Sequence, residues 1–274
     1  MNKQLITVLV SAFVVIALLL FGVQGLIVKR SAELLPKTDL EIRTRLLNLA
    51  ESYKAGKHYA KAKDALKRYT EKFPDAQDAE KIRKEHEEIS MEILLSATVT
   101  DDSLLYEIRP GDSLTTIASR FGTTLELLKI SNDLKSDLIY PGRFIKVTRT
   151  KFNILVDKSE NTLWLRGSNG DIVKRYAVST GANLSTPVGT FKIEEKLVKP
   201  VWYTVGAVVD PDSSEYELGS RWMGLSVEGY GIHGTRDAST IGQHITKGCV
   251  RMRNEDVEEL YAIVPSGTTV TIVE

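Results

Sequence analysis

The hydrophobic and polar positions of this 274-residue chain change character several times from one end to the other. The first stretch, Leu5 to Val28, is apolar and holds no charged residue. In a helix of about 1.5 Å rise per residue it would reach roughly 36 Å, which exceeds a bilayer core of about 30 Å. Because this run is longer than the apolar core of a signal peptide, we predict that residues 1–30 form a membrane anchor or an uncleaved signal.

Residues 31–100 carry many charges, and their apolar residues recur three and four positions apart, which indicates helices. The region resembles one tetratricopeptide-type helix pair in the spacing of Leu49, Ala50, Tyr53, Tyr59, Ala62 and Pro74. A single pair cannot build a repeat solenoid, so we favour a helical spacer over the alternative, a surface for a protein partner. We expect His58 and His86, on charged helices, to face solvent.

Residues 105–149 predict a compact unit of strand, helix, helix and strand. Tyr106 to Arg109 alternates as a strand, and the turn after it reaches Ser113, a residue type that caps helices well. A second helix is expected from Leu125 to Ile130. The strand from Arg143 to Val147 then closes the unit.

This unit resembles a LysM domain in its Y-x-[IV]-x-x-G-D-[ST]-L-x-x-I-A pattern, its central asparagine and its [IL]-x-x-G-x-x-[IL] ending. The resemblance implies binding of glycans that contain N-acetylglucosamine, here peptidoglycan. Because a glycan wall lies outside the cytoplasm, the chain after the anchor is expected to face the periplasm or the wall. The candidate glycan-binding residues, for which helix capping or core packing is an equal alternative, are Asp112, Ser113, Leu114, Asn132 and Ile139.

From Phe152 onward the pattern consists of short alternating runs separated by turns. Strands are predicted at Ile154–Val156, Thr162–Leu165, Ile172–Ser179, Thr190–Ile193, Val201–Tyr203 and Thr269–Val273. One helix is predicted from Asn254 to Ile263, with Asn254 as its cap. Residues 151–274 are therefore expected to form a mostly-β domain. The whole chain is predicted to be multidomain, with a transmembrane helix, an α-helical spacer, a βααβ module and this mostly-β domain.

The candidate chemistry lies in two glycine-flanked segments, Gly231-Ile232-His233-Gly234-Thr235 and Thr246-Lys247-Gly248-Cys249-Val250-Arg251-Met252. Cys249 is the only cysteine of the chain. A lone cysteine is more often a small buried hydrophobe than a nucleophile. A thiol nucleophile, however, needs a base and donors for an oxyanion, and these segments offer both. An exported chain with one cysteine also keeps its thiol free, which modestly favours catalysis.

The pattern HGT followed by [ST]-x-G-C-[IV]-R-[ML] resembles the catalytic signature of the L,D-transpeptidases, the YkuD-like enzymes that cross-link peptidoglycan. The likeness extends over residues 152–274, through Val178-Ser179-Thr180-Gly181, Thr186-Pro187-Val188-Gly189-Thr190-Phe191 and Leu218-Gly219 with Trp222-Met223-Gly224-Leu225. It implies that Cys249 is the nucleophile and His233 its base. It also implies that the carbonyl of Gly234 orients His233.

Further roles follow from the same resemblance. Amides near Gly248 and Cys249 are oxyanion-hole candidates, and Thr246 stands where many members have serine. Arg251 is expected to stabilise charge or contact a substrate carboxylate, and a structural ion pair is an equal alternative. His244 is the competitor for the role of base, and we interpret it as a surface loop residue.

Composition narrows the function classes. The 36 Lys and Arg residues balance the 36 Asp and Glu residues, which argues against nucleic-acid binding. Neither a zinc-site spacing nor a cofactor motif is present, so we expect no metal and no cofactor. We predict a membrane-anchored, wall-facing enzyme that forms 3→3 cross-links through a cysteine acyl-enzyme on tetrapeptide stems. The alternatives are an L,D-carboxypeptidase, an enzyme that links proteins to peptidoglycan or unlinks them, and a catalytically silent wall tether.

Overall fold

A computed structural model describes residues 38–204, 207–213 and 216–274. It divides into two compact units, residues 1–83 and 84–274. Within the described ranges, no helix is both long and apolar enough to cross a membrane. The apolar run predicted to anchor the chain, residues 5–28, lies outside the described residues.

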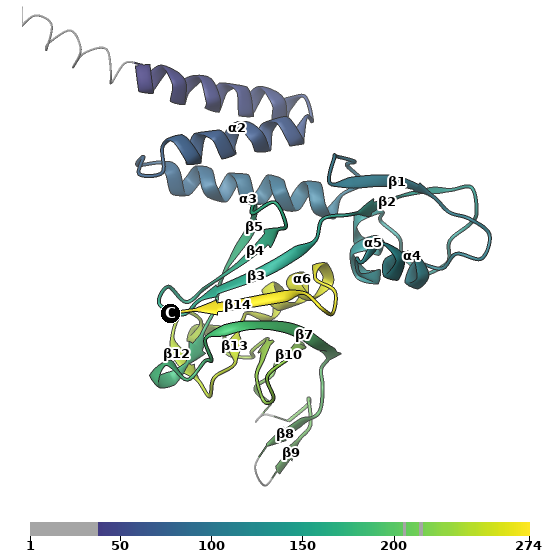
Figure 1. The fold of residues 1–274 in the computed structure, drawn as a ribbon, viewed down its shortest axis with the longest axis vertical. Helices are drawn as coiled ribbons and strands as arrows, with labels where there is room; N and C mark the ends of the chain where they lie inside the picture. The colour runs from purple at the N-terminus through teal and green to yellow at the C-terminus, as the bar shows by residue number, and fades with distance from the viewer. Residues whose placement is uncertain (1–37, 205–206, 214–215) are drawn as a thin grey trace, which may run out of the picture. The chain divides into compact units, whose positions relative to one another are not determined.

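The first unit is helical. Residues 38–55 form its first helix, α2 (Tyr59–Lys72) its second, and α3 (Ala79–Leu95) begins within it (Figure 1). Tyr69 is fully buried, and its hydroxyl donates to Asp78 at 2.5 Å while accepting from Arg43 Nε at 2.9 Å. Arg43 also pairs with Asp78 at 2.8 Å, so one network joins the first helix and α2 to Asp78, the residue directly before α3.

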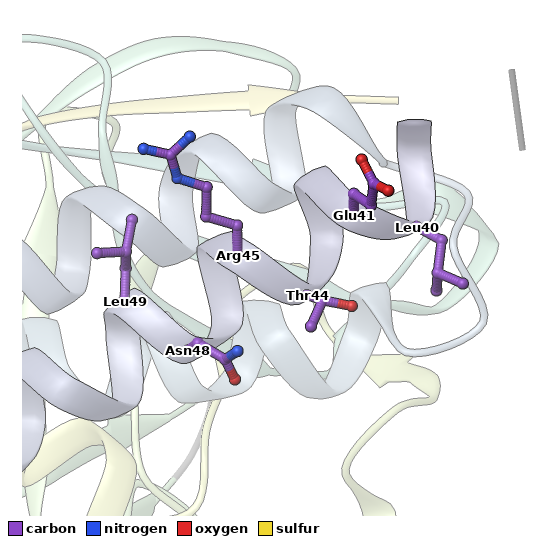
Figure 2. A pocket seen from close by; sticks show the side chains of 6 residues that line it. All are labelled: Leu40, Glu41, Thr44, Arg45, Asn48 and Leu49. Atoms are coloured by element: carbon purple, nitrogen blue, oxygen red, sulfur yellow. The ribbon is translucent and has the colours of Figure 1, made fainter. Parts of the chain in front are cut away.

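The first helix also lines a cavity of about 540 Å³. Figure 2 shows side chains of this helix around it, namely Leu40, Glu41, Thr44, Arg45, Asn48 and Leu49. Leu40 is largely exposed. None of the candidate catalytic residues is among the residues that line this cavity.

The second unit begins with the predicted βααβ module. Strand β1 (Ser103–Glu107) pairs antiparallel with β2 (Phe144–Thr148), and α4 (Leu114–Phe121) and α5 (Leu125–Ser131) lie between them in the chain. Ser113 caps α4 as predicted, accepting from the Thr116 amide, and Thr124 caps α5. Gly122 ends α4 in the left-handed conformation that glycine adopts without strain. The module's buried core is Tyr106, Ile108, Leu114, Ile117, Ala118, Leu128, Ile145 and Val147.

The remainder of the second unit is built on an eight-stranded sheet of order β13-β11-β10-β7-β14-β3-β4-β5. Its strands are β3 (Phe152–Asp157), β4 (Thr162–Gly167), β5 (Ile172–Ala177), β7 (Gly189–Val198), β10 (Arg221–Leu225), β11 (Gly231–His233), β13 (Val250–Arg251) and β14 (Thr269–Val273). Two small sheets join β6 (Thr180–Gly181) to β12 (His244–Thr246) and β8 (Trp202–Thr204) to β9 (Ala207–Val209). In Figure 1 the β8–β9 hairpin projects beyond the end of β7.

Helix α6 (Asn254–Ile263) packs on this sheet through five buried residues and contacts β10 and β11. It spans the residues predicted, but Asn254 is its first helical residue and not its cap. The cap position is Arg253, and the Asn254 carboxamide instead accepts from the Ser220 amide at 2.9 Å. The prediction of this cap is therefore wrong, because a partner distant in sequence engages the side chain.

The second half of α3 contributes to the core of the eight-stranded sheet. Met91 and Leu94 lie in the same buried cluster as the strands and α6. The ammonium of Lys146, buried on β2, donates to the carbonyl of Ile93 in the last turn of α3 and, at 2.8 Å, to that of Ser96 directly after the helix. His86 is also buried, so its expected exposure is wrong. It shares one helical face with Ile82 and Ile89, four and three positions away, and that face packs inward.

Asn132 offers a direct test of how the module is held together. Its carboxamide donates to the carbonyls of Leu128 (2.8 Å) and Lys146 (2.9 Å) and accepts from the Lys146 amide (2.7 Å). Replacing it with alanine leaves these backbone groups unpaired, so Asn132→Ala should lower the free energy of unfolding by roughly 2–3 kcal/mol. Urea denaturation measures this. Thr115→Ala, at an exposed position of α4, is the matched control and should change stability by less than about 0.5 kcal/mol. An unchanged Asn132→Ala variant would contradict the bracing role.

Candidate active site

The two glycine-flanked segments meet because β11 and β13 pair in parallel, with Ile232 opposite Val250 and His233 opposite Arg251. Side chains alternate along a strand, so Ile232 and Val250 point to one face, and both are buried in the core. His233, Arg251 and Cys249, the residue directly before β13, therefore share the opposite face. Cys249 and His233, distant in sequence, become neighbours through strand pairing.

Burial and one hydrogen bond fix the state of His233. The imidazole is 3% exposed, and its Nδ1 lies 2.7 Å from the carbonyl oxygen of Gly234. A carbonyl only accepts, so Nδ1 carries the proton and Nε2 is left as the acceptor. Burial lowers the pKa of His233 to about 4, the Gly234 bond opposes that shift, and the charge of Arg251 adds to it. The imidazole is therefore neutral near pH 7.

Cys249 is half-buried, and its thiol donates to the Gly229 carbonyl at 3.7 Å. Burial raises the pKa of the Cys249 thiol above its ordinary value. A backbone hydrogen bond from Gly231 and the charge of Arg251 act in the opposite direction and are weaker. The thiol and the imidazole are thus both neutral at rest. A stable thiolate–imidazolium pair is therefore not favoured at rest.

Glycines make room for this arrangement. Gly234 has the carbonyl that orients His233, and a Cβ on it would lie 2.2 Å from Asn254 Oδ1. Gly248 has a φ of 129°, and a Cβ there would lie 2.5 Å from the ring of Tyr230. Neither position has room for a larger side chain. The geometry therefore requires glycine directly after His233 and directly before Cys249.

The turn before Cys249 assigns roles to Thr246 and Gly248. The Thr246 hydroxyl donates to the Cys249 carbonyl at 2.6 Å and accepts from the Gly248 amide at 3.2 Å. This corrects the expectation that the Gly248 amide is free to stabilise an oxyanion, because the hydroxyl already occupies it. Thr246 therefore shapes the turn, and the amide of Cys249 is the remaining candidate of the two.

Arg251 lies on the same face as Cys249 and His233 and also forms an ion pair. Its Nη2 lies 3.3 Å from Glu217 Oε2, and its Nη1 lies 3.5 Å from the Thr240 hydroxyl. Its buried Nε has no partner within the described part of the chain. Nothing in the sequence around Glu217 or Thr240 signals this contact, since both lie outside the two signature segments.

His244, the competing histidine, lies on the short strand β12 and not in a loop. Its Nδ1 is 2.8 Å from the Thr180 hydroxyl, and its Nε2 is 3.3 Å from the Asn161 carboxamide. Both ring nitrogens are thus used to join β12 to β6 and to the turn before β4. This arrangement favours a structural role for His244.

Comparisons with known proteins now bear on the site. A family model described as the L,D-transpeptidase catalytic domain, YkuD, matches residues 151–272, and a LysM domain model matches residues 106–148. The YkuD proteins of Bacillus licheniformis and Bacillus subtilis, both named for L,D-transpeptidase activity, are 34% and 35% identical to this chain. Each match covers 62% of this chain and 98% of the relative. This chain belongs to the YkuD family of L,D-transpeptidases.

Among solved structures, the chain matches an L,D-transpeptidase from Mycobacterium smegmatis. It is 18% identical, has a TM-score of 0.40, and the match covers 48% of this chain and 64% of that one. The expected order of a LysM domain followed by a YkuD catalytic domain is confirmed by the family models. In the described part of this L,D-transpeptidase, no group of three or more His, Cys, Asp or Glu side chains is arranged to hold a metal ion.

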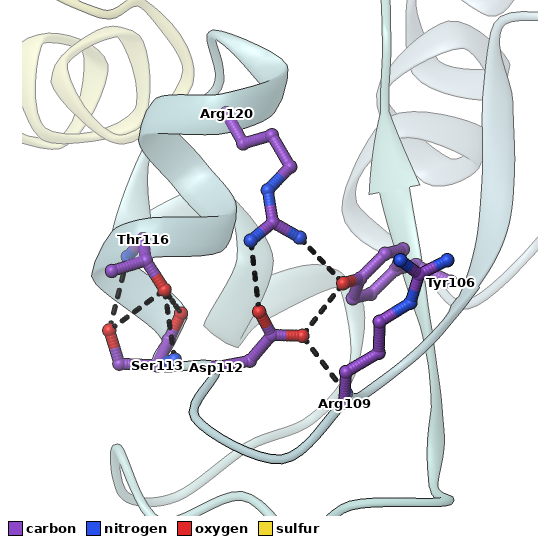
Figure 3. Close-up of polar contacts among 6 residues, drawn as sticks. All are labelled: Tyr106, Arg109, Asp112, Ser113, Thr116 and Arg120. Atoms are coloured by element: carbon purple, nitrogen blue, oxygen red, sulfur yellow. Dashed lines mark hydrogen bonds and ion pairs between the residues drawn. The ribbon is translucent and has the colours of Figure 1, made fainter.

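Most of the candidate glycan-binding residues in the LysM domain of this YkuD-family enzyme have structural roles in the domain. Figure 3 shows the Asp112 carboxylate accepting from the Tyr106 hydroxyl (2.7 Å), the Arg109 amide (2.9 Å) and Arg120 (3.1 Å). These bonds, the Tyr106 hydroxyl first, hold the pKa of Asp112 below its usual value. Ser113 caps α4 and Leu114 is in the core. Asn132 braces β2, and Ile139 packs against the module's core.

The low pKa of His233 predicts a pH dependence of stability. An unfolded histidine titrates near 6.5, so the unfolded chain binds the proton first as the pH falls. Protonation of the unfolded chain therefore lowers the free energy of unfolding. This loss is absent above about pH 6.5, grows as the pH falls, and reaches about 3 kcal/mol by pH 4. His233→Gln should remove this part of the acid destabilisation, as measured by urea unfolding at pH 7, 5 and 4. His58→Gln, at an exposed histidine, should keep it. Equal pH dependence in wild type and His233→Gln would contradict the neutral, buried imidazole.

Proposed function

We propose that this L,D-transpeptidase forms 3→3 cross-links in peptidoglycan through an acyl-enzyme on Cys249, while residues 5–28 anchor it in the cytoplasmic membrane. The observation that carries the proposal is the parallel pairing of β11 with β13. It gathers a thiol, a neutral imidazole and a guanidinium on one face of the sheet, in a chain of this family. A peptidoglycan-binding module directly before the catalytic domain supports an envelope location.

The proposed first half-reaction begins at the carbonyl that precedes the terminal D-Ala of a tetrapeptide stem. As Cys249 Sγ attacks, its proton passes to Nε2 of His233, and the carbonyl oxygen becomes an oxyanion. The Gly234 carbonyl, already bonded to Nδ1–H, stabilises the imidazolium that forms. Collapse of the oxyanion expels D-Ala, whose amine takes the proton from Nε2. The product is a thioester on Cys249.

In the second half-reaction the amine of a neighbouring stem attacks the thioester. His233 Nε2 accepts a proton from that amine and returns it to the departing sulfur, which restores the starting state. The Cys249 amide is the proposed oxyanion donor. Arg251 favours negative charge at the sulfur through its own positive charge. Its partner Glu217 limits that effect, since the two groups lie 3.3 Å apart.

The LysM domain is proposed to hold glycan strands near the catalytic domain and so to raise the local concentration of stems. Asp112 and Asn132 are occupied by structural hydrogen bonds. The exposed side chains of Leu138 and Tyr140, on the loop that also contains Ile139, are better placed to meet a sugar ring. The helices of residues 38–83 are proposed to space the anchor from the wall.

The test uses full-length chain in detergent, with Cys249→Ala as its control. Each is incubated with purified disaccharide-tetrapeptide, and the products are separated and weighed by mass spectrometry. We expect dimers that have lost one D-Ala, with formation reduced more than about a thousandfold in Cys249→Ala. The tandem spectra should place the new bond between two third-position residues.

Other outcomes select the alternatives. Tripeptide without dimer would show that water resolves the thioester, which is carboxypeptidase activity. Stems transferred to an added lysine-containing protein would show a linking enzyme. Unchanged tetrapeptide would contradict catalysis and leave a wall tether.

A further inference from the structure

The strands of the candidate site form two rows of side chains on one face of the sheet. Trp222 of β10 lies opposite His233 of β11, which lies opposite Arg251 of β13. In the next row Gly224 lies opposite Gly231. Because residues two apart share a face, the two glycines lie beside Trp222 and His233 on the Cys249 side. The two glycines add no side chains to this row, so a large neighbour can extend over them between Glu195 of β7 and Cys249.

The indole of Trp222 fills that space. A Cβ on Gly231 would lie 2.6 Å from Cη2 of Trp222, and a Cβ on Gly224 would lie 3.1 Å from its Nε1. The ring is also stacked on the imidazole of His233, with centroids 5.9 Å apart and planes at 24°. Trp222 further packs against a buried cluster formed by Val209, Tyr216 and Leu218. The indole is thus held from several sides while it contacts His233.

His233 needs such a neighbour because its hydrogen bonding leaves freedom. In the described structure its side chain makes one hydrogen bond, from Nδ1 to the Gly234 carbonyl. One bond fixes a point on the ring but does not fix the plane, and the direction of Nε2 depends on the plane. An aromatic ring stacked at 24° removes that rotation. It also excludes water from the imidazole.

We propose that Trp222 is a positioning residue for acylation of Cys249, which holds the plane of the His233 imidazole and keeps it dry. This inference rests on the proposed function, in which Nε2 of His233 takes the thiol proton. Trp222 touches neither the scissile bond nor the proton. It acts only through the geometry and surroundings of His233.

The groups around His233 determine in which direction its pKa should change when the indole is removed. Burial is the largest cause of the low pKa of His233, and Arg251, from β13, is the charged group that adds to it. Glu217 partly offsets Arg251, and Glu195 of β7 lies on the far side of Gly224. The indole face itself favours a cation, which opposes burial. Since burial dominates, loss of the indole should raise the pKa of His233 towards its ordinary value.

The experiment compares two replacements in the full-length chain. Trp222→Phe keeps a planar ring, and Trp222→Leu keeps apolar volume without one. Trp164→Ala, at a half-buried tryptophan of β4 outside the site, controls for loss of a tryptophan. The rate of Cys249 acylation by a carbapenem is followed by intact-protein mass spectrometry from pH 4 to 8. The pKa of His233 is measured separately by NMR of the imidazole.

We expect Trp222→Phe to acylate within about threefold of wild type and to keep the low pKa of His233. Trp222→Leu should acylate roughly 10- to 100-fold more slowly, the cost of a misplaced catalytic group. In Trp222→Leu the pKa of His233 should rise by about one unit or more. The acid limb of the pH profile of its acylation rate should shift by the same amount.

A Trp222→Leu variant that matches wild type in both readouts would overturn the inference. So would a Trp222→Phe variant as slow as Trp222→Leu with an unchanged pKa of His233. If wild type itself is not acylated, the proposed function fails, and the NMR titration alone decides whether Trp222 shields His233.

Discussion

Two short strands at the edge of the eight-stranded sheet, β11 and β13, run in the same direction, and the candidate site depends on that pairing. Parallel neighbours cannot be joined by a tight hairpin and need a long connection. Residues 234–249 supply it, passing through β12 before returning to the sheet edge. The amide of Met252 donates to the carbonyl of His233 at 2.8 Å, and Arg251 exchanges backbone hydrogen bonds of 2.8 Å with Ser179. These contacts hold the edge strand, and with it the thiol, beside the imidazole.

The same pairing explains the electrostatics of the site. The inner face of β11 and β13 joins the hydrophobic core, so the outer face is close to apolar surroundings and shielded by Trp222. Burial then acts on both members of the pair in opposite directions, raising the pKa of the thiol and lowering that of the imidazole. A neutral pair costs less in this setting than a thiolate beside an imidazolium. In the proposed reaction, charge therefore develops on the pair only as the sulfur attacks a substrate carbonyl.

Most helices and strands can be predicted from the sequence. Contacts between residues that are distant in sequence are predicted poorly. Capping residues identify α4 and α5, because a cap is a local signal, and the extent of α6 is also predicted although its cap is not. The predicted strands include β3, β4, β5 and β14, which alternate clearly, but not β10, β11 or β13, which carry the site. These three are short or rich in glycine, and β13 is paired only through residues distant in sequence. The same limit explains the misplaced role of Asn254, whose partner Ser220 is distant in sequence. The residues that decide the burial of His86 and the occupation of the Gly248 amide are close in sequence: Ile82 and Ile89 on the same helical face, and Thr246 two residues away.

Cys249 and His233 rest as a neutral thiol and a neutral imidazole, and the chemistry proposed for the site depends on this resting state. The most direct measurement is the rate of Cys249 alkylation by iodoacetamide between pH 5 and 10, in wild type and in His233→Gln. We expect the wild-type rate to keep rising through pH 9, because the pKa of the thiol lies above its ordinary value. His233→Gln should show nearly the same profile. A wild-type rate that is already high and flat below pH 7, and is lost in His233→Gln, would show a resting thiolate–imidazolium pair and contradict the account.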